Sequence, residues 1–74
     1  MIYAQRMKDL REDHDYTQQD IADILKIDRS YYGKYERGIH PTPTDIIIKL
    51  CRLYGVSADY MLGLTDQPRP LPKK

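Results

Sequence analysis

The sequence is poor in the residues that build disulfides, metal sites and membrane spans. It has one cysteine, Cys51, and neither tryptophan nor phenylalanine. A lone cysteine forms no intrachain disulfide, and His14 and His40 lie too far apart to suggest a metal site. No apolar run approaches the roughly 18–20 residues that cross a bilayer, and the charged N-terminal segment does not resemble a signal peptide. We therefore expect a cytoplasmic chain that needs no metal or other cofactor.

Net positive charge is nearly absent as well. The 74 residues carry 12 Lys and Arg against 11 Asp and Glu, which gives a formal net charge of +1. The charges are unevenly placed, because acidic residues concentrate between 9 and 23. Basic residues gather between 26 and 40, namely Lys26, Arg29, Lys34 and Arg37. Any binding of nucleic acid would therefore depend on where the charges lie and not on their sum.

The chain is long enough for one domain, and its pattern is all-α. Apolar residues recur at helical spacing, as Tyr3, Met7 and Leu10 do near the N-terminus. Pro41 and Pro43 exclude regular helix from the segment around them. The predicted helices span about residues 3–14, 17–25, 29–36, 45–54 and 58–62. We expect one domain over residues 1–64 and a flexible Pro- and Lys-rich tail over 65–74.

Capping residues set the predicted helix ends. Thr17 followed by Asp20 resembles a short capping box. The isoleucine triplet 46–48 also fits the start of a strand, but the apolar spacing and the length of this segment favour helix. The other predicted N-caps are Asp28, Thr44 and Ser57, and glycines follow three helix ends at Gly38, Gly55 and Gly63.

The segment "DRSYYGKYERG" combines two helical faces. At 100° per residue, Tyr32 and Tyr35 point to one side, which we expect to face the core. The other side carries Arg29, Ser30, Gly33 and Lys34, with Tyr31 at its edge. Arginine, serine and lysine are residues that contact base edges or phosphates in DNA. A glycine there either lets the helix backbone approach a partner closely or is a tolerated weakness in a short helix.

Two capped helices joined by a three-residue turn are typical of a helix-turn-helix. "TQQDIADILKIDRSYYGKYERG", followed by "PTDIIIKLCRLYGVSADYMLGL", resembles the phage-repressor/Cro-type helix-turn-helix (XRE) family over about residues 5–64. The resemblance implies a compact, five-helix, lambda-repressor-like domain with its helix-turn-helix at about 17–37. It also implies that Ala22 lies where the second and third helices cross, within a core of Ile21, Leu25, Ile27, Tyr32 and Tyr35.

The resemblance further assigns contacts with double-stranded DNA. The bases would be read at Arg29, Ser30 and Lys34, with Tyr31 and Gly33 between them. Gln18 would hold a phosphate, helped by free N–H groups at the start of its helix. The other candidates for phosphate contact are Thr17, Arg37, His40, Thr42 and Thr44.

The resemblance also implies an ion pair between Arg11 and Glu36, which would join the first helix to the third. Two positions depart from the family pattern. Lys26 stands where glycine is usual in the turn, and Asp15 replaces the small residue that usually follows the first helix. A left-handed backbone at Lys26 would cost about 1 kcal/mol, and the alternative is a slightly different turn.

Ala58, Met61 and Leu64 form a possible exposed apolar patch, unless Leu64 folds back onto the domain. The family usually dimerises through this end, so we expect a homodimer on DNA. The predicted function is that of a sequence-specific transcriptional regulator, a repressor, on the bacterial nucleoid. The alternative is a protein-interaction module, such as an antitoxin or an accessory adaptor, with the same fold. The sequence shows no catalytic cluster and no site for a small-molecule ligand, so we do not expect an enzyme.

Overall fold

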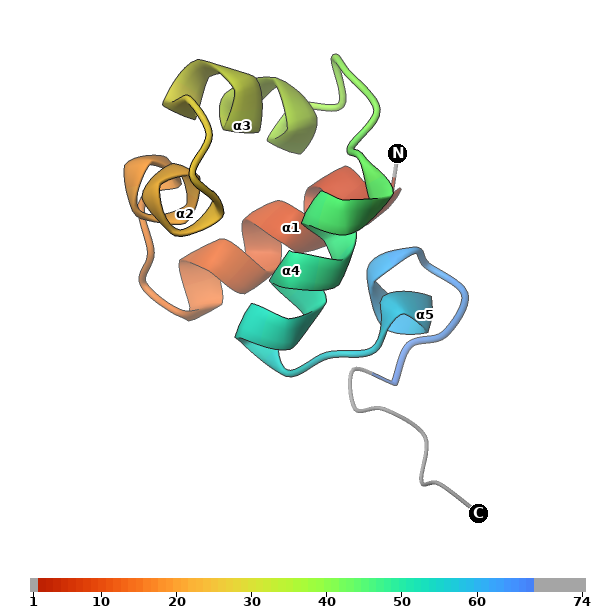
Figure 1. Ribbon diagram of the computed structural model, residues 1–74. Helices are drawn as coiled ribbons and strands as arrows, with labels where there is room; N and C mark the ends of the chain where they lie inside the picture. Colours follow the sequence, from red (N-terminus) through yellow and green to blue (C-terminus); the bar gives the residue numbers. More distant parts are fainter. Residues whose placement is uncertain (1, 68–74) are drawn as a thin grey trace.

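The computed structural model describes residues 2–67, which form five helices (Figure 1). The predicted all-α class is confirmed, and each predicted helix end lies within one residue of the observed one. In Figure 1, α1 and α4 occupy the middle of the molecule, α3 lies at the top beside α2, and α5 lies on the right. The helices are α1 (Ile2–Asp13), α2 (Gln18–Leu25), α3 (Arg29–Glu36), α4 (Thr44–Tyr54) and α5 (Ala58–Met61).

The helix-turn-helix consists of α2, a tight turn and α3. Thr17 and Asp20 form a complete capping box, because the Thr17 Oγ1 accepts the Asp20 N–H and the Asp20 carboxylate accepts the Thr17 N–H. Lys26 ends α2 in the left-handed region with φ 60° and ψ 43°. Asp15 is also left-handed, with φ 59°. The turns after α1 and α2 therefore both have the left-handed backbone that favours glycine, although Asp15 and Lys26 stand there.

The start of α4 differs from the prediction. Thr44 was expected to be the N-cap, but Pro43 occupies that position and Thr44 is the first residue of the helix. Proline is well suited to a helix start because it has no backbone N–H. The N–H groups at that end have no partner within the helix, so nothing is lost there. The isoleucine triplet lies within the helix, and Gly55 ends it with φ 69°.

All five helices contribute residues to the core. Tyr32 is fully buried at the centre of α3, and Ala22 is fully buried on α2. The hydroxyls of Tyr32 and Tyr54 are buried without a hydrogen-bond partner among the described residues, and burial raises the pKa of both. The predicted core residues Ile27 and Tyr35 are only partly buried and pack against its edge.

The short helix α5 corrects another prediction. Met61, expected on an exposed apolar patch, is fully buried in the core, whereas the next residue, Leu62, is 41% exposed. The helix is only four residues long, and its orientation depends on long-range contacts with α1 and α4. Four residues make barely one turn, so helical periodicity could not show which side faces inward.

Arg6 ties the segment after α5 to α1. Its guanidinium donates hydrogen bonds to the carbonyl oxygens of Tyr60 and Thr65, at 2.5 and 2.7 Å, and lies 4.1 Å from the centroid of the Tyr60 ring. It also pairs with the exposed Asp66 at 3.1 Å. The first residues of the predicted flexible tail are therefore held on the domain, and residues 68–74 of that tail lie outside the described residues.

Candidate nucleic-acid interface

The helix α3 presents one face to the core and another to solvent, because its apolar and polar residues lie on different sides. Tyr32 anchors the inner face, while Arg29, Ser30 and Tyr31 are exposed. Lys34 is partly exposed, and its Nζ lies 5.7 Å from the centroid of the Tyr31 ring. Four of the five residues predicted to contact bases therefore share a solvent-facing surface.

Gly33 is the fifth of those residues, and the side chains of Gln18 and Arg37 cover it. A Cβ at this position would lie 3.5 Å from Oε1 of Gln18 and 3.9 Å from Nη2 of Arg37. Arg37 also donates a hydrogen bond from Nε to the Gly33 carbonyl oxygen at 3.1 Å. Gly33 is thus buried beneath two polar side chains, and it does not lie on the open face that the sequence suggested.

A hollow of about 290 Å³ opens beside this glycine, between the start of α2 and the outer side of α3. The residues that line it are all polar apart from the glycine itself: Gln18, Arg29, Ser30, Gly33 and Arg37. The hollow therefore joins residues predicted to read bases with residues predicted to hold phosphates. Helical periodicity alone could not reveal it, because its lining comes from two helices and from long side chains that fold back over α3.

The ion pair expected between Arg11 and Glu36 is present and joins α1 to α3. Arg11 Nη2 lies 2.8 Å from Glu36 Oε1, and Arg11 Nε lies 3.0 Å from Glu36 Oε2. The two side chains are only 13% and 2% exposed. Arg11 Nη1 also donates to the Tyr16 carbonyl oxygen at 2.8 Å. This planar, two-pronged arrangement holds α3 against α1 in one orientation.

Burial alone would raise the pKa of Glu36, but the hydrogen bonds from Arg11 and Gln18 outweigh that effect, and the pKa is lowered. The same pair raises the pKa of Arg11. Glu36 is therefore ionised at neutral pH, and its negative charge is compensated inside the domain. The outer face of α3 stays positively charged, because the carboxylate of Glu36, the only one in that helix, is paired with Arg11.

Gln18 connects this ion pair to the start of α2. Its Nε2 donates to Glu36 Oε1 at 3.4 Å, a long hydrogen bond. One amide hydrogen is engaged in this way, and the second remains for another acceptor. The first N–H groups of a helix have no partner within that helix, so the start of α2 offers further donors. Gln18 is therefore positioned by α3 at a helix end that favours anions.

The remaining candidates for phosphate contact divide into two groups. Thr17, Arg37, His40 and Thr44 are exposed. Thr42 is buried, and its hydroxyl donates to the sulfur of Met7 at 3.7 Å. The prediction of a phosphate contact from the Thr42 side chain is therefore wrong, because the loop turns that side chain toward α1.

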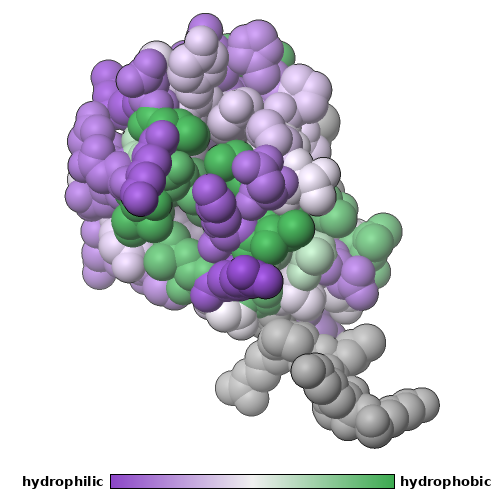
Figure 2. Space-filling model, in the orientation of Figure 1, coloured by the Kyte–Doolittle hydropathy of each residue, from purple (hydrophilic) through white to green (hydrophobic). Residues whose placement is uncertain are grey.

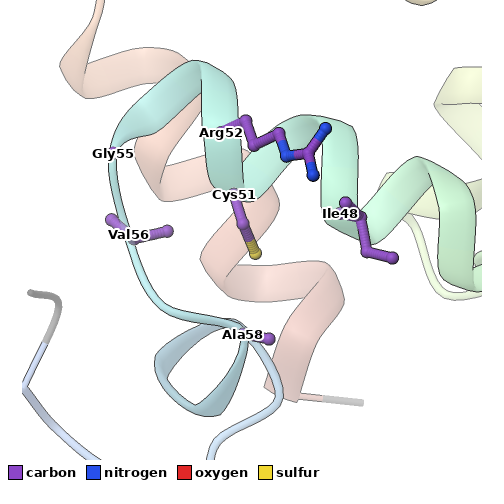
Figure 3. A pocket seen from close by; sticks show the side chains of 6 residues that line it. All are labelled: Ile48, Cys51, Arg52, Gly55, Val56 and Ala58. Carbon is purple, nitrogen blue, oxygen red and sulfur yellow. The ribbon is translucent and has the colours of Figure 1, made fainter. Parts of the chain in front are cut away.

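A second surface feature is apolar and lies between α4 and α5. A hollow of about 370 Å³ is lined by Ile48, Cys51, Arg52, Gly55, Val56 and Ala58 (Figure 3). The side chain of Ile48 is 44% exposed at its edge, and Leu64 is 75% exposed beyond α5. In Figure 2, hydrophobic surface shows over α4 and α5, whereas the surface along the top, where α3 lies, is mostly hydrophilic.

Membrane, metal and thiol chemistry can be described for residues 2–67. None of their helices is long and apolar enough to cross a bilayer. Within the same range, no three His, Cys, Asp or Glu side chains are grouped so as to hold a metal ion. Cys51 is buried, and burial raises the pKa of its thiol, which therefore packs as a small apolar side chain.

Known proteins resemble this chain over most of its length. It is 45% identical over 69 residues to the uncharacterized HTH-type transcriptional regulator YobD of Bacillus subtilis, which covers 93% of this chain and 62% of YobD. It is 40% identical over 63 residues to the HTH-type transcriptional regulator ImmR of the same organism, covering 85% of this chain and 50% of ImmR. The antitoxin PezA of Streptococcus pneumoniae is 36% identical over 70 residues, covering 95% of this chain and 44% of PezA.

The chain thus spans less than two thirds of the length of each of these relatives. A family model described as helix-turn-helix matches residues 7–61, from α1 to the end of α5. That range contains α2, the turn at Lys26 and α3 in the arrangement described above. The chain therefore belongs to the XRE-type helix-turn-helix family.

Proposed function

We propose that this chain is a sequence-specific, double-stranded DNA-binding transcriptional regulator that acts as a repressor. The observation that carries the proposal is the exposed face of α3, with Arg29, Ser30 and Tyr31 beside the anion-favouring start of α2. An α-helix fits the major groove, where each base pair presents a distinct pattern of donors, acceptors and methyl groups. With α3 in that groove, the bound protein excludes RNA polymerase from an overlapping promoter in the bacterial cytoplasm.

The contacts divide by chemistry. Arg29 and Lys34 donate to guanine O6 and N7 or to phosphate, Ser30 contacts a base edge, and Tyr31 packs on a thymine methyl. The phosphates are held by groups that flank α3 along the chain, and these contacts fix its register without reading sequence. The proposed phosphate contacts come from Thr17, Gln18, Arg37, His40 and Thr44.

We further propose that two copies bind together on DNA. Ala58 and Leu64 remain candidates for the interface, and the apolar hollow beside Ala58 supplies surface that a second copy would cover. Met61 is removed from the predicted interface, since its side chain belongs to the core. A two-fold dimer would set its recognition helices about one DNA turn apart, so an operator with two inverted half-sites is expected.

A mobility-shift titration with the DNA upstream of the gene, at two salt concentrations, tests the proposal. Specific binding should weaken as salt rises, because phosphate contacts release counterions. Arg29→Ala should weaken binding by about 1–3 kcal/mol and relax the preference at one base position. Gln18→Ala should weaken binding to all sequences alike. If Arg29→Ala changed neither affinity nor preference, the base contact assigned to Arg29 would be wrong.

A second candidate function is that of an antitoxin, which binds a partner protein. It is favoured by the similarity to PezA and by the apolar hollow at α4 and α5. Co-expression with the neighbouring gene product distinguishes the two. A stable complex with that product, and no salt-sensitive shift of upstream DNA, would support the antitoxin. A salt-sensitive, sequence-specific shift without a partner would support the repressor.

A further inference from the structure

The chain reverses direction directly after α5, in a turn closed by two backbone hydrogen bonds. The Leu64 N–H donates to the Asp59 carbonyl oxygen at 2.8 Å. Gly63, which is left-handed with φ 84°, donates its N–H to the Tyr60 carbonyl oxygen at 3.1 Å. This is a Schellman motif, in which the residue at the place of Leu64 commonly packs on an apolar residue at the place of Asp59. Asp59 is polar and exposed, and Leu64 is 75% exposed, so the turn directs a leucine side chain to solvent.

A charged side chain of α1 holds the same turn. Arg6 is only 14% exposed, and its Nη1 donates hydrogen bonds to the carbonyl oxygens of Tyr60, before the turn, and Thr65, after it. The guanidinium carbon lies 4.1 Å from the centroid of the Tyr60 ring, a cation–π distance. The ion pair with Asp66 adds little, because that carboxylate is 99% exposed. One guanidinium thus joins the two ends of the turn and fixes both to α1.

Core packing does not order this segment, since no residue between 62 and 67 is buried. The last buried side chain before the turn is that of Met61. The helix α5 has four residues, and a helix of one turn is not stable by itself. The turn therefore keeps its shape through its own hydrogen bonds and those from Arg6. Removing the Arg6 donors should loosen residues 62–66 and leave the core packed.

The side chains that this turn presents are apolar. Ala58, Leu62 and Leu64 are exposed, and Ala58 also lines the apolar hollow beside α4. An apolar surface associates more tightly when it is ordered beforehand, because the association then does not include the cost of ordering it. The shape of the turn therefore decides how well Leu64 serves as a contact for a second copy.

We propose that Arg6 is a positioning residue for assembly on DNA, and that it holds the turn after α5 in the shape that presents Leu64 to a second copy. The proposal rests on the proposed function, in which two copies bind together, and adds a residue of α1 to the requirements of that step. Arg6 acts through the turn, because its guanidinium is occupied by the two carbonyl oxygens and the Tyr60 ring. Binding of two copies should therefore depend on Arg6, whereas the contact of a single copy with its half-site should not.

Arg6→Met tests this role, because it removes the donors and keeps a long side chain. The matched control Gln5→Met places the same side chain at the neighbouring, exposed position of α1. Each variant is titrated, at a temperature where circular dichroism shows it folded, against upstream DNA with both half-sites and against the same DNA with one half-site scrambled. Arg6→Met should bind the single half-site within about twofold of the wild type and the intact operator at least about tenfold more weakly. Gln5→Met should match the wild type on both.

A double-variant cycle with Leu64→Ser separates positioning from a general loss of stability. If Arg6 acts through Leu64, Arg6→Met should weaken binding to the intact operator much less in the Leu64→Ser background than in the wild type. Additive losses would overturn the proposal, as would equal losses on the two DNAs or wild-type binding by Arg6→Met. A wild-type chain that bound the intact operator no more tightly than a single half-site would overturn the binding of two copies, and one without a salt-sensitive shift would overturn the proposed function itself.

Discussion

Removing the carboxylate of Glu36 isolates the ion pair that joins α1 to α3. In Glu36→Leu, Arg11 keeps a charge on a side chain that is only 13% exposed and has lost its partner. Breaking a buried pair from one side typically costs about 3–5 kcal/mol. A domain of this size has a total stability of roughly 3–10 kcal/mol, so the variant should be close to unfolding at 37 °C.

The matched variant Arg11→Met/Glu36→Leu removes both charges and keeps similar volume. Replacing a buried pair by apolar side chains is often neutral, so the double variant should recover most of the loss. Full recovery is not expected, because the Tyr16 carbonyl oxygen loses its bond from Arg11, at a cost of about 1 kcal/mol. The free energies of unfolding would be measured by urea titration at pH 7 for the wild type, both single variants and the double variant.

Two results of that cycle would contradict a buried, strongly coupled pair. The first is a cost below about 1 kcal/mol for Glu36→Leu, which would make the pair behave like one on the surface. The second is a double variant less stable than Glu36→Leu, which would mean that Arg11 stabilises α1 independently of Glu36.

Three further predictions concern pH, the turn and the C-terminal segment. The folded pKa of Glu36 is below its ordinary value of 4.5, so the stability that its charge contributes is present above pH 4.5 and is lost as pH falls through the folded pKa. Glu36→Gln has no such charge to lose. In urea titrations it should therefore lose less stability than the wild type between pH 5 and 3. Lys26→Gly should relieve the left-handed strain and raise stability by up to about 1 kcal/mol, whereas Lys26→Ala should give no gain; equal stabilities for the two would contradict this. Arg6→Ala removes hydrogen bonds to two carbonyl oxygens and should lower the free energy of unfolding by about 2 kcal/mol. It should also speed amide hydrogen exchange in residues 58–66 more than in α3. The exposed control Gln5→Ala should change neither quantity.

Local sequence patterns predicted the helices and their ends well. Caps, turn residues and helical spacing depend on neighbours a few positions apart, and Thr17 with Asp20 forms the expected box in the structure. The resemblance marked Lys26 as a position where glycine is usual, but the left-handed backbone there is a finding of the structure, since lysine itself does not favour that conformation. The ion pair of Arg11 and Glu36 also came from the resemblance, because 25 positions separate its members and no local pattern connects them.

The predictions that were wrong concern residues whose positions depend on long-range packing. Met61 lies on a helix too short for periodicity to indicate its orientation, and contact with other helices buries it. Thr42 turns inward because Met7, far away in the sequence, offers its sulfur. The contacts of Arg6 follow from no local pattern either, since the carbonyl oxygens it binds lie more than 50 positions away. A helical wheel puts Gly33 on the open face, because a wheel does not include the long side chains that fold over this glycine.

Photo-cross-linking to operator DNA can show whether α3 lies in the major groove. Operator DNA with 5-bromouracil in place of thymine carries its reactive atom at the position of the thymine methyl group, within the major groove. After irradiation and trypsin digestion, we expect an adduct on the peptide Ser30–Lys34, which contains the exposed Tyr31. Specific binding with adducts only on peptides from α4 and α5 would contradict it.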